Sequence, residues 1–543
     1  MNISYLDLLI IAIYLIGIVI IGIWVGGGFK KQSSNTYFLA GRSLGWGVVG
    51  ASLFASNIST VHIVGFAESG FVSGLSDGIF EWMAIPCLVF LGIFVAPFYF
   101  RKKISTIPEY FEKRFDGSSR TFMVIFAILT ALLMHIGISL YAGATIMKEF
   151  FGLDQLWGVL IISLLTALYT ILGGLKAVAV TESIQSVLLL GGSILITVFG
   201  VLMLPEVGIN SFEAFKSQIQ AGSLSMLRSD AVVAETGGIP WYAVLLGYPV
   251  LGIWYWFTDQ TIVQRALGSK SEKDARIGPM FTAVLKFAPV FFMLLPGLLA
   301  YVLFKDHIDA SGSGQTYSIL VRELLPTGLI GLVIASLLAA LMSSVAAALN
   351  STSTLISIDI VKRYNPKIQD SKLVSIGKIT AFIVMVIAIL FSLVAGAKGG
   401  SIITIVNSIG TSIAPSIAAV FILGYFWKRG TKEAAKITFL FGLVIGVLMF
   451  SLDFPDENGI KLITDTWGVI FMMQAWWAFV VCCIIFVTMS YCTQPPTAEQ
   501  QNYTFSNSAY FTKIKGITDY RIIGIAIMGV LALLWLGIEM LAY

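Results

Sequence analysis

Charged residues are scarce in this sequence. Asp, Glu, Lys and Arg make up 12% of the 543 residues, whereas soluble domains typically contain about 25%. Hydrophobic residues make up 57%, and the mean hydropathy is +0.89. A chain of this composition cannot cover a globular surface with polar groups, so the sequence predicts a protein whose solvent is the lipid bilayer. The net charge of +4 is too small to indicate a nucleic-acid partner.

Residues that build disulfides, metal centres or catalytic clusters are also few. The four cysteines are Cys87, Cys482, Cys483 and Cys492. Three of them lie in apolar runs and none shows ligand spacing, which argues against a disulfide framework or a zinc site. We find no cluster of His, Asp and Ser or Cys at a recognised catalytic spacing. The sequence therefore predicts a protein that is not an enzyme.

Long apolar runs are abundant. A membrane span needs about 20 mostly apolar residues, and we count about 14 candidates. They lie at 8–25, 46–75, 79–99, 121–150, 155–173, 179–204, 240–265, 279–304, 327–361, 373–395, 401–427, 434–453, 467–491 and 522–541. The N-terminus lacks the basic region of a cleaved signal peptide, so we interpret it as a retained helix.

The basic residues predict the orientation of these spans. If the N-terminus is outside, most of the 34 Lys and Arg residues fall in inside loops, notably at 101–120, 265–276 and 362–378. Cytoplasmic loops carry such an excess. Because the number of spans is even, the C-terminus is also predicted to lie outside. We expect a multi-pass protein of the cell (inner) membrane.

Two spans contain polar or helix-breaking residues. The run 46–75 is interrupted near Asn57 and His62, and 240–265 contains Gly247, Pro249 and Gly252. They are the first spans of two blocks of five, 46–204 and 240–427. Paired broken helices in corresponding positions indicate a transport site at the membrane midplane. Since five is odd, the second block enters the membrane in the opposite sense, which predicts an inverted repeat. Residues 1–45 add a leading helix and loop, and 428–543 add three further helices.

Among the charged residues within the apolar runs, Glu81 and Lys286 stand out. A charge at the bilayer centre costs at least about 2.5–3.5 kcal/mol, so it normally faces a cavity or a partner. We interpret Glu81 as a hydrogen-bond acceptor for solute hydroxyls; the alternative is an interfacial carboxylate. Lys286 is interpreted as a donor that faces a cavity; the alternative is a side chain that reaches the inner surface.

Three further residues lie beside the interrupted stretches. His62 is one of only three histidines and is either a solute contact or a hydrogen-bonded core residue. Tyr255 and Trp256 either pack in the core or form a stacking surface and gate, because aromatic faces suit the C–H faces of a sugar ring.

The run 335–360 is rich in small and hydroxyl side chains. Close helix packing explains its alanines but explains the adjacent Ser343 and Ser344 less well. Two hydroxyls and the carbonyls of an unwound helix would make an all-oxygen shell for a hard cation. Ala55 and Ile58, beside the first interruption, are the candidate carbonyl donors.

Five segments resemble one known family. YFLAGRSLGWGVVGASLFASNIS, ISTIPEYFEKRF, DQTIVQRAL, ALMSS with LNSTSTLISIDI, and PSIAAVFILGYFWKR are similar to the sodium:solute symporters. They look most like the sodium/glucose (galactose) cotransporters. The resemblance is colinear from about residue 5 to residue 440 and implies an all-α, leucine-transporter-like fold with an inverted 5+5 repeat.

The resemblance also implies functional residues. It places a sodium ion at Ala55, Ile58, Ala340, Ser343 and Ser344, and an ion exit path at Glu182, where the family has Asp. It places the sugar at His62, Glu81, Tyr255, Trp256, Lys286 and Asn407, with Tyr255 as the inner gate. Asn407 stands where relatives carry a glutamine, so the favoured sugar is expected to differ.

The function implied is sodium-driven import of a monosaccharide by alternating access. Val345, Ala346 and Ala347 follow the paired serines where two-sodium relatives carry hydroxyls, which predicts one sodium per solute. The alternatives are myo-inositol, an amino sugar, sialic acid or an amino acid such as proline. A carboxylate solute is less favoured because no intramembrane arginine is evident. Glu68 and Asp77 are additional acids near the predicted outer mouth.

Overall fold

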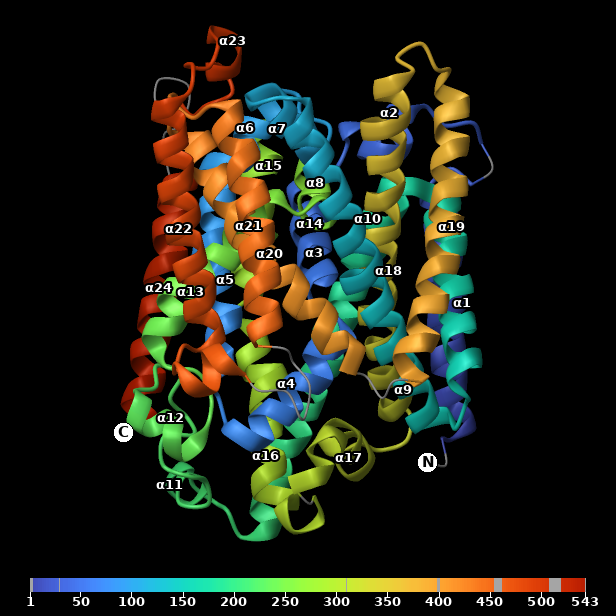
Figure 1. Cartoon of the computed structure of the whole chain (residues 1–543). Helices are drawn as coiled ribbons and strands as arrows, with labels where there is room; N and C mark the ends of the chain where they lie inside the picture. The colour runs from blue at the N-terminus through green and yellow to red at the C-terminus, as the bar shows by residue number, and fades with distance from the viewer. Residues whose placement is uncertain are drawn as a thin grey trace.

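A bundle of long helices makes up the protein (Figure 1). The computed structural model describes residues 3–28, 30–308, 310–397, 401–453, 461–506 and 519–542, and these residues form helices and no sheet. Ten helical segments in this part of the chain are long and apolar enough to cross a membrane, or up to twelve with two bent pairs. The polar and apolar pattern of the sequence therefore predicted the class of fold correctly.

The first repeat follows the leading helix α1 (Tyr5–Val25) and the short α2 (Ser34–Leu39). Its elements are α3 (Trp46–Asn57), α4 (Thr60–Ser73), α5 (Gly78–Phe90), η2 (Leu91–Val95), α6 (Ala96–Arg101), α7 (Ile107–Arg114), α8 (Gly117–Thr130), η3 (Ala131–Gly137), α9 (Ile138–Phe151) and α10 (Gln155–Met203). Helix α10 contains two predicted spans, joined at Gly174, where φ is 64° and ψ is −161°. A β-carbon at Gly174 would lie 2.5 Å from the Tyr37 carbonyl oxygen, so glycine is required there.

The second repeat follows the loop helices α11 (Phe212–Lys216) and α12 (Asp230–Thr236). Its elements are α13 (Trp241–Ile253), η5 (Trp254–Thr258), α14 (Gln260–Leu267), α15 (Glu272–Leu285), η6 (Val290–Leu294), α16 (Leu295–Phe304), α17 (Thr316–Leu324), α18 (Leu329–Thr354), η9 (Leu355–Lys362), α19 (Asp370–Ala397) and α20 (Ser401–Phe426). The remaining helices are α21 (Lys432–Leu452), α22 (Phe471–Cys492), the short α23 (Ala498–Gln501) and α24 (Tyr520–Ala542). Both chain ends lie on one side of the bundle (Figure 1), as an even number of spans requires.

The first predicted interruption is a break between α3 and α4. Ile58 and Ser59 are extended, with ψ values of 107° and 170°, and the two helices meet at an angle of 61°. The Ser59 hydroxyl and the His62 side chain cap the start of α4. Such caps satisfy amide groups that a broken helix leaves without partners.

The second interruption lies elsewhere than Gly247, Pro249 and Gly252. Helix α13 passes through all three residues, and the chain becomes extended at Asp259, where ψ is 117°. Gly247 is instead a packing residue, because a β-carbon there would lie 2.3 Å from the Met472 carbonyl oxygen of α22. The glycines thus reflect close helix contact rather than unwinding.

Two large apolar clusters form the interior. The first apolar cluster contains residues of α5, η5, α14 and α15, such as Trp82, Phe257 and Ile262. The second apolar cluster contains residues of η3, α9, α10 and α18, such as Ile136 and Leu140. The clusters meet along α3, where Leu53 belongs to the first cluster and Phe54 to the second, just before the break at Ile58.

Candidate functional site

A cavity of about 410 Å³ lies between the two broken helices. Its lining includes residues from the α3–α4 break, from α5, η3 and η5, and from α18. Five of the six predicted solute contacts line it: His62, Glu81, Tyr255, Trp256 and Lys286. Its volume is within the range of pockets that hold small molecules. The sixth contact, Asn407, lies outside the residues whose side chains the structure describes.

Glu81 and Lys286 form a buried ion pair in this cavity. The Lys286 Nζ lies 2.6 Å from a Glu81 carboxylate oxygen, and the two side chains are 1% and 7% exposed. Lys286 also donates to the Asn57 side chain, whose amide donates to the Tyr255 hydroxyl at 3.0 Å. A Lys286 side chain that reaches the protein surface is not compatible with this arrangement. The pair places hydrogen-bond donors and acceptors at the wall of the cavity.

Aromatic side chains flank the ion pair. Lys286 Nζ lies 5.6 Å from the centroid of the Trp256 ring, and the Tyr255 and Trp256 rings are perpendicular with centroids 5.0 Å apart. His62 Nδ1 lies 2.9 Å from the Ser59 hydroxyl. The His62 side chain therefore also helps to cap the start of α4. Polar groups and ring faces together suit a ring-shaped polyol.

The α3–α4 break releases carbonyl groups from helical pairing. The Ser59 amide, the helical partner of the Ala55 carbonyl, donates instead to His62 Nδ1. The His62 amide, the partner of the Ile58 carbonyl, donates instead to the Ser59 carbonyl. The broken helix therefore presents the two carbonyl oxygens that the sequence proposed for a cation.

Helix α18 brings its two serines to these carbonyls. The Ser343 hydroxyl donates to the Ala55 and Ala340 carbonyls, both at 2.8 Å, and the Ser344 hydroxyl donates to the Ala340 carbonyl at 3.2 Å. The donor set is hydroxyl and carbonyl oxygen, which fits a hard cation such as sodium. Ser344 also lines the cavity, so this set of oxygen atoms adjoins the cavity.

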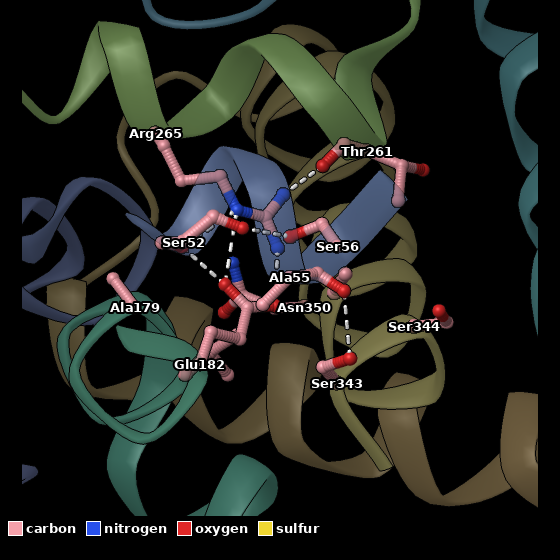
Figure 2. A network of polar contacts seen from close by, with 12 residues as sticks. Ser52, Ala55, Ser56, Ala179, Glu182, Thr261, Arg265, Ser343, Ser344 and Asn350 are labelled. Atoms are coloured by element: carbon pink, nitrogen blue, oxygen red, sulfur yellow. Dashed lines mark hydrogen bonds and ion pairs between the residues drawn. The ribbon is translucent and has the colours of Figure 1, made fainter. Parts of the chain in front are cut away.

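Glu182 of α10 points toward the same stretch of α3, where Ser52 lies (Figure 2). Its carboxylate pairs with Arg265 of α14 at 2.6 Å, and both side chains are fully buried. The Ser52 hydroxyl of α3 also donates to Glu182. The sequence placed Arg265 in an inside loop, whereas its side chain is buried against Glu182. It lies in the last turn of α14 (Gln260–Leu267), whereas in the sequence it stands at the end of the apolar run 240–265.

Another pair was not singled out from the sequence. His135 of η3 lines the cavity, and its Nε2 lies 2.9 Å from the carboxylate of Asp259, at the second break. The signal in the sequence is an ionisable side chain within the apolar run 121–150. The acids at the predicted outer mouth accept hydrogen bonds: Glu68 from Ser313 at 2.8 Å and Asp77 from Ser69 at 2.6 Å.

Known proteins share both the sequence and the fold. The sequence signature of the sodium:solute symporter family matches residues 37–446. The sodium/glucose cotransporter 1 of Oryctolagus cuniculus is 33% identical over 528 residues, covering 90% of this chain and 79% of that protein. The sodium/myo-inositol cotransporter 2 of Sus scrofa is 32% identical over 542 residues, covering 93% and 79%. A sodium-coupled sialic acid symporter superposes with a TM-score of 0.73 at 21% identity, covering 91% of this chain and 99% of that one.

The broken helices and the inverted repeat define a secondary transporter of the leucine-transporter-like fold. This is a multi-pass membrane protein that handles a small molecule, and it is not an enzyme. The chain belongs to the sodium:solute symporter family.

Proposed function

We propose that the protein imports a monosaccharide of the glucose or galactose type together with one sodium ion. The observation that carries this proposal is the adjacency of two sites at one helix break. The cavity with the Glu81–Lys286 pair offers hydrogen bonds to hydroxyl groups, and the oxygens of Ala55, Ile58, Ala340, Ser343 and Ser344 suit sodium. Ser344 belongs to both sites.

Coupling follows from this shared break. Sodium at Ser343 and Ser344 would order the α3–α4 junction, which also shapes the solute cavity. Each ligand then favours the same conformation, and this is sufficient for coupling. We further propose that sodium leaves past Glu182, displacing Arg265, and that Tyr255 moves to release the sugar inside.

The proposal also covers the number of sodium ions per solute and the orientation of the protein in the membrane. Val345, Ala346 and Ala347 are fully buried and carry no hydroxyl, which supports a single sodium site beside the serines. We place the protein in the cell membrane with both termini outside, and divide it at 1–45, 46–204, 240–427 and 428–543.

Inositols are the main alternative solutes, because the Glu81–Lys286 pair suits any polyol and relatives at similar identity are named for myo-inositol. The test is uptake into proteoliposomes with sodium or choline outside, across glucose, galactose, inositols, amino sugars, sialic acid and proline. We expect sodium-dependent uptake of a monosaccharide and a strong loss of affinity in Lys286→Ala. Uptake of proline or sialic acid alone would refute the assignment of the solute.

A further inference from the structure

A groove of about 310 Å³ lies between the first half of α10 and the middle of α19. All of its lining side chains are apolar except that of Ser163, which is buried. Leu164, Leu168 and Phe382 line the groove and are exposed, so it opens on the surface of the bundle that faces lipid. A polar molecule would lose its hydrogen bonds with water there, whereas an acyl chain has none to lose. The groove therefore suits the chain of a lipid.

One end of the groove lies at the break in α10. Ile171 and Leu172 line this end, and the helix breaks at Gly174. The carbonyls of Ile171 and Leu172 accept from loop side chains instead, the first from the Tyr37 hydroxyl and the second from the Gln32 amide, both at 3.1 Å. Tyr37 belongs to α2, which lies at the opposite end of the bundle from both chain termini (Figure 1). Tyrosines at the ends of membrane helices lie at the level of the lipid headgroups.

Two lysines lie at this end of the groove. Lys378 precedes Phe382 by one turn of α19 and therefore lies on the same face of that helix. Its Nζ lies 5.6 Å from the centroid of the Tyr37 ring, and the Tyr37 hydroxyl is bonded to the end of the groove. Lys176, two residues beyond the break, is exposed. Within the described part of the chain, no carboxylate forms an ion pair with either lysine.

We propose that the groove binds a single phospholipid with an anionic headgroup. An acyl chain lies along Leu164, Leu168 and Phe382, and the phosphate lies at Lys378. Lysine binds phosphate as a compact charge, and basic pockets between membrane helices bind anionic headgroups. The headgroup supplies the anion that the end of the groove lacks, which favours a lipid over a second copy of this chain. The site requires neither the solute nor sodium, so it goes beyond the proposed function.

The test is native mass spectrometry of the protein released from nanodiscs that contain equal amounts of phosphatidylglycerol and phosphatidylcholine. For the most tightly held lipid of the wild type, we expect about a fivefold preference for phosphatidylglycerol, the effect of one lysine on an anionic lipid. Lys378→Gln should lose this preference and Lys378→Arg should keep it. Lys436→Gln removes an exposed lysine of α21 and is the matched control, which should behave like the wild type. Ala167→Phe fills the groove and should release the lipid.

Thermal unfolding in detergent gives a second readout. Added phosphatidylglycerol should raise the Tm of the wild type and of Lys378→Arg, but not that of Lys378→Gln, because only a bound lipid stabilises the folded state. Equal retention of the two lipids by the wild type, or an unchanged preference in Lys378→Gln, would overturn the inference. A dimer that Ala167→Phe dissociates would also overturn it, because a second copy of the chain would then cover the groove. If Ala167→Phe does not fold, the comparison of Lys378→Gln with Lys378→Arg still decides.

Discussion

Replacing Ser343 with alanine should weaken sodium binding without unfolding the protein. The hydroxyl is fully buried and lies between the carbonyls of Ala55 and Ala340. A hydrogen bond or ligand to a charged group contributes about 1.5–3 kcal/mol, which corresponds to about a 10- to 100-fold weaker affinity for sodium. The change removes one atom and keeps the helix, so the fold should lose only about 1 kcal/mol.

The assay is a sodium titration of uptake at saturating solute, together with sodium-dependent thermal stability in detergent. Ser336→Ala is the matched control: Ser336 is on the same helix, is fully buried and donates to the Val333 carbonyl at 2.7 Å, two turns before Ser343. We expect the control to titrate like the wild type. Equal sodium dependence in the two variants would refute the assignment of Ser343 as a sodium ligand.

Two predictions concern stability. Arg265→Gln leaves Glu182 as a buried unpaired charge and should destabilise the protein by about 3–5 kcal/mol in thermal unfolding, whereas adding Glu182→Gln should restore much of this; an additive loss in the double variant would contradict the pairing. Gly247→Ala drives a β-carbon into the Met472 carbonyl and should cost about 1–3 kcal/mol. Gly191→Ala, with no atom within 4 Å, should be neutral or slightly stabilising; equal effects of the two changes would contradict the packing role of Gly247.

The spans and the first break could be predicted because each follows from local composition. An apolar run of about 20 residues forms a helix in lipid, because its backbone groups must pair within the run. The polar residues around Asn57 interrupt such a run. The second break could not be placed in this way. Pro249 lies inside a continuous helix, and the extended residue is Asp259, which the sequence presents as an ordinary start of a helix.

The buried charged residues show a second limit of prediction from the sequence. Glu81 and Lys286 stood out because they lie within apolar runs, and the structure pairs them. None of Lys286, Arg265 and His135 could be matched to its partner from the sequence, because the partners lie 205, 83 and 124 residues away along the chain. Hydropathy describes a residue's neighbours in sequence, whereas these pairs depend on which helices pack together.

Accumulation of solute against its gradient tests sodium coupling most directly. Proteoliposomes would hold equal sodium concentrations on both sides, with an inside-negative potential of about 100 mV set by potassium and valinomycin. One sodium entering with each sugar contributes about 2.3 kcal/mol at this potential, which predicts up to about fiftyfold accumulation. Replacing sodium with choline should abolish it. Accumulation that is unchanged in choline, or counterflow at full rate and affinity without sodium, would contradict the account.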